Sequence, residues 1–270
     1  MHHPGLKCYH YSITKHKPNH KLVKRILIVD DNAVNRKYAK GLLKAEDLEI
    51  VEVEDGPSAI EMYGQQHFDL VLMDIQMPGM DGFECLRTIR EKYPNDYSPI
   101  LAVTAFSSDR EKHEFMDAGF QALIPKPIKP ADLKASVKHW LTGAQAATPK
   151  ESTEEVQGEF IIDMKFYEDL KKHIRSDTLI DIYEEYEKET KGFLEQLNFL
   201  VPAKNYPEIL SILHTIKGNA GSLGIFNMAD HTQQMEGALR EGSYSNLEHN
   251  FDLLKVQFSD FVDNYRRLLT

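Results

Sequence analysis

Three aspartates stand where short apolar runs of the chain end. Asp30 and Asp31 follow the run 26–29, and Asp74 follows the run 70–73. If these runs are strands of a parallel sheet, their carboxyl ends meet at the edge where such sheets bind ligands. Three carboxylates at one point repel each other and require a cation, and a pocket lined with oxygen atoms suits Mg2+. The sequence therefore predicts a magnesium site.

A hydroxyl and an ammonium group follow two further apolar runs. Thr104 ends the run that starts at 100, and Lys126 follows the run 122–124. Phosphoryl transfer requires a nucleophile and groups that stabilise charge on the phosphoryl oxygens. Asp74 is the predicted nucleophile, because its run has the central place in the expected sheet.

We assign the metal ligands as follows. Asp31 is the expected main ligand, Asp30 and Asp74 support it, and the backbone carbonyl of Gln76 supplies a further oxygen. An aspartate at the end of a strand is often only a turn residue or a helix cap. Five polar residues at successive strand ends favour the chemical interpretation.

A second candidate site lies in the stretch SILHTIKGNAGSLGI. Its apolar residues share one helical face, whereas His214 and Lys217 lie together on the flank, one turn apart. Gly218 and Gly221 continue that surface. Because glycine is unfavourable inside a helix, two glycines beside a histidine indicate that another backbone or domain comes close here.

A neutral imidazole is a competent nucleophile toward phosphorus, and Lys217 could stabilise the phosphoryl oxygens. The alternatives are an ordinary surface histidine near a helix end, or zinc binding by His214 with His231 and His249. The histidine spacing matches no compact zinc motif. We therefore favour His214 as a second phosphoryl acceptor.

Two kinds of hydrophobic periodicity predict the elements that position these residues. Within 25–141, short apolar runs alternate with amphipathic stretches, which predicts a parallel sheet with helices on both faces. Within 160–270 only helical spacing recurs, which predicts an antiparallel bundle. The expected strands are 26–29, 49–53, 70–73, 100–103 and 122–124. The expected helices are 33–44, 58–66, 83–92, 108–118, 131–141, 163–173, 178–200, 207–220, 227–241 and 247–269.

Two segments show no such periodicity. Residues 1–24 form a basic, histidine-rich tail, and residues 142–159 are small, polar and acidic, as is typical of a linker. A flexible linker of roughly 18 residues reaches about 20 to 25 Å. Transfer between the two candidate sites of one chain is then feasible if their faces can meet.

Charge and composition exclude several classes of function. The chain carries a net charge of −10, and residues 151–270 hold 12 Lys and Arg against 22 Asp and Glu. Such a surface disfavours binding to nucleic acid or to anionic membranes. The two cysteines, Cys8 and Cys85, are too few for a disulfide framework. Without an apolar run long enough for membrane insertion or a signal peptide, we expect a cytoplasmic protein.

The first region resembles response-regulator receiver domains. The matching residues are Asp30-Asp31, Asp74 before Met77-Pro78-Gly79, Thr104, and Lys126-Pro127. The resemblance implies a flavodoxin-like (βα)5 fold with parallel strand order 2-1-3-4-5, bound Mg2+ and a short-lived aspartyl phosphate on Asp74. One departure is Leu123, where many receivers have a Tyr or Phe that acts in their output switch.

The second region, about 160–270, resembles histidine-containing phosphotransfer (HPt) domains. The matching residues are His214-Thr215-Ile216-Lys217-Gly218, Ala220-Gly221 and Leu223-Gly224. The resemblance implies a four-helix bundle, sometimes with an extra N-terminal helix, and reversible phosphorylation of His214 on Nε2.

Together the two resemblances predict a phosphorelay protein. Asp74 would accept a phosphoryl group from the phosphohistidine of a sensor histidine kinase, and His214 would pass it to a downstream response regulator. No ATP-binding kinase module is recognised, so we expect a signalling protein and not an enzyme, with partners other than nucleic acid and no direct membrane insertion. A phosphohydrolase is the first alternative, although Gln76 stands where haloacid-dehalogenase enzymes carry a second acid. A non-transferring scaffold or phosphate sink that docks a kinase is the other.

Overall fold

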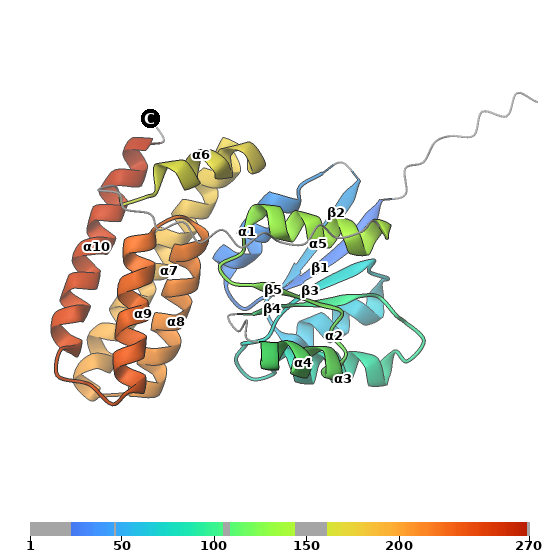
Figure 1. Cartoon of the computed structure of the whole chain (residues 1–270), viewed down its shortest axis with the longest axis horizontal. Helices are drawn as coiled ribbons and strands as arrows, with labels where there is room; N and C mark the ends of the chain where they lie inside the picture. Colours follow the sequence, from blue (N-terminus) through green and yellow to red (C-terminus); the bar gives the residue numbers. More distant parts are fainter. Residues whose placement is uncertain (1–22, 46, 105–108, 144–160, 269–270) are drawn as a thin grey trace, which may run out of the picture.

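The computed structural model describes residues 23–45, 47–104, 109–143 and 161–268. Within these ranges the chain forms an α/β domain followed by a bundle of helices (Figure 1). The predicted tail, 1–24, and the predicted linker, 142–159, fall almost entirely outside the described residues. Among the helices described, none has the length and apolar character needed to cross a membrane.

The α/β domain contains a single five-stranded parallel sheet with the order β2-β1-β3-β4-β5, which confirms the predicted topology. Its strands are β1 (Lys24–Val29), β2 (Leu48–Val53), β3 (Leu70–Asp74), β4 (Ile100–Thr104) and β5 (Ala122–Pro125). The register pairs Val29 of β1 with Met73 of β3. Asp30 and Asp74, the next residues on each chain segment, therefore reach the same edge of the sheet.

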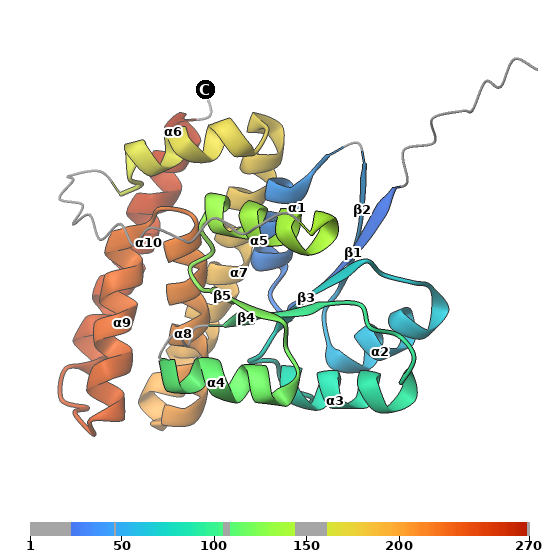
Figure 2. The ribbon, with the colours of Figure 1, turned by 45° about the vertical axis from the view of Figure 1, so that its right-hand side comes forward.

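Side-chain alternation along the strands explains why both faces of the sheet are covered. In β1, Ile26 and Ile28 enter one hydrophobic core, whereas Leu27 and Val29 enter the other. Such strands, buried on both faces, give the short continuous apolar runs seen in the sequence. Helices α1 and α5 cover the first face, and α2, α3 and α4 cover the second (Figures 1 and 2).

The helices of this domain begin at residues suited to capping. Asn32, Asp55 and Asp81 each accept a hydrogen bond from the backbone N–H three residues later, at the start of α1, α2 and α3. The helices are α1 (Ala33–Leu43), α2 (Gly56–Gln65), α3 (Gly82–Lys92), α4 (Asp109–Ala118) and α5 (Pro130–Thr142).

Four long antiparallel helices form the second domain, as predicted, and an additional helix precedes them. They are α7 (Ser176–Ala203), α8 (Tyr206–Ser222), α9 (Phe226–Arg240) and α10 (Leu247–Leu268), after α6 (Met164–His173). Each of the four packs against the next, and α10 also packs against α7, which closes the bundle. Helix α6 lies across one end of it (Figure 1).

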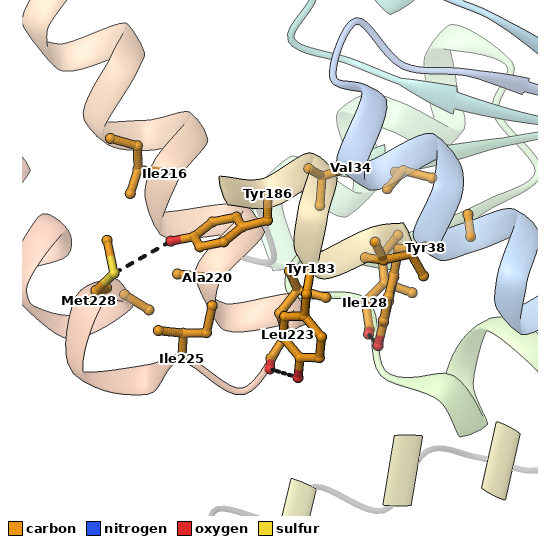
Figure 3. Packing of buried hydrophobic residues seen from close by; sticks show 14 of the residues in the cluster. Val34, Tyr38, Ile128, Tyr183, Tyr186, Ile216, Ala220, Leu223, Ile225 and Met228 are labelled. Atoms are coloured by element: carbon orange, nitrogen blue, oxygen red, sulfur yellow. Dashed lines mark hydrogen bonds between the residues drawn. The ribbon is translucent and has the colours of Figure 1, made fainter. Parts of the chain in front are cut away.

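The two domains share one hydrophobic core. The core on the α1 and α5 face of the sheet continues without a break into the bundle. Figure 3 shows Tyr38 of α1 and Ile128 close to Tyr183 of α7. The hydroxyl of Tyr38 donates to the carbonyl of Ile128 (3.1 Å), and that of Tyr183 donates to the carbonyl of Leu223 (3.0 Å). Buried tyrosines with satisfied hydroxyls join the domains through a packed interface.

Candidate functional site

The acidic pocket forms at the carboxyl ends of β1 and β3. Asp74 is the last residue of β3, and Asp30 and Asp31 lie in the turn between β1 and α1. Asp30 and Asp74 are buried, whereas Asp31 is exposed. One oxygen from each of the three carboxylates lies within 4.8 Å of the others. The structure thus brings together the three aspartates that the sequence singled out.

Lys126 bridges two of these carboxylates. Its Nζ lies 2.8 Å from Oδ2 of Asp74 and 3.2 Å from Oδ2 of Asp30. Burial alone disfavours an ammonium group, but the attraction of Asp30 and Asp74 outweighs it and raises the pKa of Lys126 above its usual value. Lys126 therefore remains charged and partly neutralises the pocket.

The carboxyl of Asp74 is harder to ionise than an ordinary aspartate. Burial raises the pKa of Asp74 to about 7; the charge of Lys126 opposes this shift, and the charges of Asp30 and Asp31 add to it. Partial desolvation of its carboxyl group within the pocket and the charge of Asp30 also raise the pKa of Asp31, although the residue as a whole is exposed. Burial and mutual repulsion make these carboxyl groups hard to ionise, and a divalent cation would stabilise their ionised form.

The other predicted members of the pocket lie where the strand ends put them. Thr104 is fully buried at the end of β4, and its carbonyl accepts the backbone N–H of Lys126 (2.8 Å). The backbone N–H of Gln76 donates to Oδ1 of Asp74 (3.3 Å). Leu123, the residue that departs from the usual aromatic, packs against the core on the α2, α3 and α4 face.

Gly82, which the sequence did not single out, allows α3 to begin close to the acidic pocket. The N–H of Gly82, at the start of α3, donates to the carbonyl of Ile75 (3.0 Å). A Cβ atom on Gly82 would lie 2.5 Å from the carbonyl oxygen of Asp74 and 3.0 Å from Cα of Ile75. Only glycine permits α3 to start this close to the strand that carries Asp74.

The donor set fits Mg2+. Carboxylate oxygens gathered at one point, two from buried aspartates and one from the exposed Asp31, are the hard ligands that this ion prefers. Among the residues that the structure describes, Asp30, Asp31 and Asp74 form the one group of three or more Asp, Glu, His or Cys side chains close enough to hold a metal ion together. The described residues do not form the alternative zinc site. His231 is buried and hydrogen-bonded to Gln257 (2.7 Å), and it does not cluster with His214 and His249.

The second site centres on His214 in α8. Its Nδ1 lies 3.1 Å from Oε1 of Glu236, a buried residue of α9. Because an ionised carboxylate can only accept a hydrogen bond, Nδ1 is the protonated nitrogen of the neutral ring and Nε2 carries the lone pair. The histidine side chain is 25% exposed. The hydrogen bond therefore holds the imidazole in one tautomer and leaves Nε2, the nitrogen that the resemblance implied as the acceptor, free of this contact.

Glu236 is the main functional candidate that sequence reasoning missed. Besides His214, it accepts hydrogen bonds from Lys217 (2.6 Å) and Arg240 (2.9 Å). Burial by itself would raise the pKa of Glu236, but the hydrogen bonds from His214, Lys217 and Arg240 outweigh it and lower this pKa to about 2. The sequence did contain a signal for this residue. Glu236 is an acidic residue at helical spacing from Thr232 and Leu239, on the buried face of α9.

Lys217 has a partner within the protein that spacing along the sequence did not reveal. Its ammonium forms a salt bridge with Glu236, and its role toward phosphoryl oxygens stays a prediction. Glu236 lies on a helix that is close to α8 only in the folded bundle, and so spacing along α8 could not reveal it. His214 and Lys217 are one turn apart and share this single carboxylate.

The two predicted docking glycines differ in their surroundings. A Cβ atom on Gly221 would lie 3.3 Å from Cβ of Pro127, in the α/β domain, whereas one on Gly218 would meet nothing within 4 Å. Another domain does come close at Gly221, as the sequence suggested. Gly218 remains open.

Replacing Glu236 with Gln is expected to lower the free energy of unfolding at pH 7 by about 1–2 kcal/mol, because three donors lose a charged acceptor. The pKa of Glu236 is lowered from its ordinary 4.5 to about 2. Its stabilising contribution is therefore present above pH 4.5 and lost as the pH falls toward 2. Urea unfolding at pH 7 and pH 3.5 should show the difference between wild type and variant narrowing. Glu241→Gln, at an exposed residue, is the control; a difference that is equally large at both pH values would contradict the charge-based explanation.

Comparison with known proteins identifies both domains. Residues 26–138 match the family model of the response regulator receiver domain, and residues 181–267 match that of the Hpt domain. The chain joins a receiver domain to an HPt domain. Receiver and HPt domains are the parts of two-component phosphorelay proteins, and this chain belongs to that class.

Its relatives include both single receivers and large sensors. The receiver–HPt chain is 31% identical over 123 residues to the polar-differentiation response regulator DivK of Brucella ovis, covering 46% of this chain and 100% of DivK. It is 28% identical over 213 residues to the aerobic respiration control sensor protein ArcB of Escherichia coli, covering 78% of this chain. It is 25% identical over 253 residues to the signal transduction histidine-protein kinase BarA of Escherichia coli, covering 92% of this chain. The matched part is 27% of the length of ArcB and of BarA.

Proposed function

We propose that the receiver–HPt chain relays a phosphoryl group from a sensor histidine kinase to Asp74, then to His214, and from there to a downstream response regulator. The observation that carries this proposal is the His214 imidazole, held at Nδ1 by Glu236 so that Nε2 is free of that hydrogen bond. The similarity to ArcB and BarA, one named a sensor and the other a histidine kinase, supports the class of donor.

In the first step the carboxylate of Asp74 attacks the phosphorus of a partner's phosphohistidine. A P–O bond forms, the P–N bond breaks, and the partner's imidazole leaves with the electron pair. Lys126, 2.8 Å from Asp74, supplies positive charge to the phosphoryl oxygens, and Thr104 at the end of β4 supplies a hydroxyl. Asp30, Asp31, Asp74 and the backbone carbonyl of Gln76 would hold Mg2+, which when bound neutralises charge that develops on these oxygens.

In the second step Nε2 of His214 attacks the same phosphorus. A P–N bond forms, the P–O bond to Asp74 breaks, and Asp74 leaves as a carboxylate. The ring of His214 becomes positively charged because Nδ1 keeps its proton. Glu236, 3.1 Å from Nδ1, compensates that charge and holds the ring in position. Transfer onward to an aspartate of a downstream regulator reverses these bond changes.

Hydrolysis of the aspartyl phosphate is the competing activity. A phosphohydrolase of this kind would use a second acid two residues after its nucleophile, and here that residue is Gln76, which is exposed. An amide cannot activate water as a general base. The phosphoryl group on Asp74 should consequently persist long enough to be transferred.

Incubation with acetyl phosphate and Mg2+ tests the acceptor role and the metal requirement together. We expect phosphorylated Asp74 to accumulate in a chain in which His214 is replaced by Gln. Chelation of the metal should slow this by about 100-fold or more, because charge stabilisation by a metal is worth several kcal/mol. Intact-protein mass spectrometry measures the phosphorylated fraction, with Asp74→Asn as the blank. Rapid release of inorganic phosphate without any phosphorylated protein would favour the phosphohydrolase.

A further inference from the structure

One carboxylate of the HPt domain contacts both the turn after β1 and the helix that carries His214. Oε2 of Glu189, in α7, accepts from the side-chain amide of Asn32 (2.6 Å), and its Oε1 accepts from the N–H of Ala33 (3.1 Å). The side-chain amide of Asn219 also donates to Glu189 (3.4 Å). Asn219 lies in α8, the helix that carries His214, whereas Asn32 and Ala33 begin α1 of the receiver.

This contact suits the physical properties of a helix start. The first N–H groups of a helix lack partners within the helix, and they favour a negative charge. Asn32 caps α1 from within the receiver, and Glu189 adds a second cap from the other domain. The backbone N–H of Asn32 in turn donates to Oδ1 of Asp30 (2.9 Å). A continuous set of hydrogen bonds thus runs from the acidic pocket through Asn32 and Glu189 to α8.

Two further contacts fix the same arrangement. Nζ of Lys37, one turn along α1, lies 2.5 Å from a carboxylate oxygen of Glu185, one turn before Glu189 on α7. In the turn after β5, Pro127 packs against Gly221 of α8. The turn after β1 and the turn after β5, which hold Asp30 and Lys126, are therefore both seated on helices of the bundle. The shared core around Tyr38 of α1 and Tyr183 of α7 joins the same two helices (Figure 3).

We propose that the phosphoryl group crosses from Asp74 to His214 within one chain, in this docked arrangement, and that Glu189 is the positioning residue that holds it. This inference rests on the proposed function. Glu189 does not take part in the bond changes of the transfer step. It ties α8 to the turn that carries Asp30 and Asp31, and so sets how the histidine helix meets the acidic pocket. Docking replaces random encounter along the linker by a fixed geometry.

Mixed chains test whether transfer occurs within one molecule. One chain carries His214→Gln and is phosphorylated on Asp74; the second carries Asp74→Asn and an intact His214. We expect wild-type transfer to proceed at a rate independent of protein concentration, and transfer between the mixed chains to be at least about 10-fold slower at low micromolar concentration. Equal rates, rising with concentration, would overturn the inference while leaving the relay intact. Absence of label on His214 in every sample would instead overturn the proposed function.

Variants of Glu189 test the positioning role. Glu189→Ala should slow transfer within the chain by about 10-fold to 100-fold, because three hydrogen bonds to a charged acceptor are lost, two of them from the receiver domain. Glu189→Gln keeps an acceptor oxygen and should recover most of the rate. Glu184→Gln, at an exposed residue of the same helix, is the matched control. Phosphorylation of Asp74 by acetyl phosphate should be unchanged in all three.

Amide hydrogen exchange tests the contact between Glu189 and α1 independently of the rate of phosphoryl transfer. The Ala33 N–H, which donates to Glu189, should exchange faster in Glu189→Ala than in Glu184→Gln, since its acceptor is gone. Faster exchange with an unchanged transfer rate would show that Glu189 only stabilises the interface, and would overturn its positioning role. Unchanged exchange would show that the docked contact does not form in solution.

Discussion

A chain carrying Asp74→Asn is expected to take up no phosphoryl label on either candidate acceptor when incubated with a phosphorylated histidine kinase. A neutral amide is a far weaker nucleophile than a carboxylate, so the first P–O bond does not form. Loss of a nucleophile commonly reduces a rate by about 1000-fold or more. The replacement has nearly the same shape, and so it should leave the buried end of β3 folded. Phosphor imaging after separation from the kinase measures the label.

The companion variant, His214→Gln, should take up label on Asp74 and keep it there. Label should then fail to reach any downstream receiver, because no P–N bond can form. His249→Gln, at an exposed histidine of α10, serves as the control and should behave like wild type. Label that reaches His214 in the Asp74→Asn chain would mean that the kinase phosphorylates the HPt domain directly, and that the proposed internal order is wrong.

The acidic pocket could be predicted because sequence-local rules determine it. In a parallel sheet each strand delivers its last residue to the same edge, and apolar runs mark where strands stop. The pairing of Val29 with Met73 then places Asp30 beside Asp74 without reference to any distant part of the chain. His214 could be predicted for a similar reason, since His214, Lys217 and Gly218 all lie within one helix.

The residues that hold His214 in place could not be predicted in this way. Glu236 meets His214 because α9 packs beside α8 with a particular rotation. The chain reverses direction between the two helices, so the spacing of 22 residues does not tell which side chains face each other. The salt bridge between Lys217 and Glu236 could not be predicted for the same reason, since Glu236 lies on that second helix. An acidic residue on the buried face of α9 departs from the usual apolar pattern, and such departures are expected at functional positions.

The contact between the two domains could not be predicted either, because it joins residues that are still further apart in the sequence. Glu189 and Asn32 are separated by 157 positions. Helix α1 reads from its sequence as an ordinary amphipathic helix covering a sheet, yet a Cβ atom on its Gly41 would lie within 3.3 to 3.6 Å of Thr178, Ile174 and Ile182 of the second domain. A linker of small polar residues indicates separate domains, and it contains no information about the surfaces that later pack together.

Replacing Lys126 with Met is expected to have the largest effect on stability. Two buried carboxylates, Asp30 and Asp74, would lose the ammonium that lies 3.2 and 2.8 Å from them. Removing one partner of a buried ion pair typically costs about 3–5 kcal/mol, because the remaining charge is left uncompensated. Urea unfolding at pH 8 measures the loss. Lys129→Met, at an exposed lysine three residues further on, should change the free energy of unfolding by about 0.5 kcal/mol or less.

The dependence of this loss on pH and on Mg2+ identifies its cause. The pKa of Lys126 is raised in the folded protein, so its stabilising contribution is complete throughout the pH range below its ordinary value of 10.5. In the variant, Asp74, whose pKa is already about 7 beside Lys126, can take up a proton as the pH falls. The deficit should therefore shrink between pH 8 and pH 6, and Mg2+ should reduce it at pH 8 by supplying the missing positive charge. A deficit unaffected by both would trace the loss to the packing of the lysine stem, and would remove the electrostatic argument for a cation at this site.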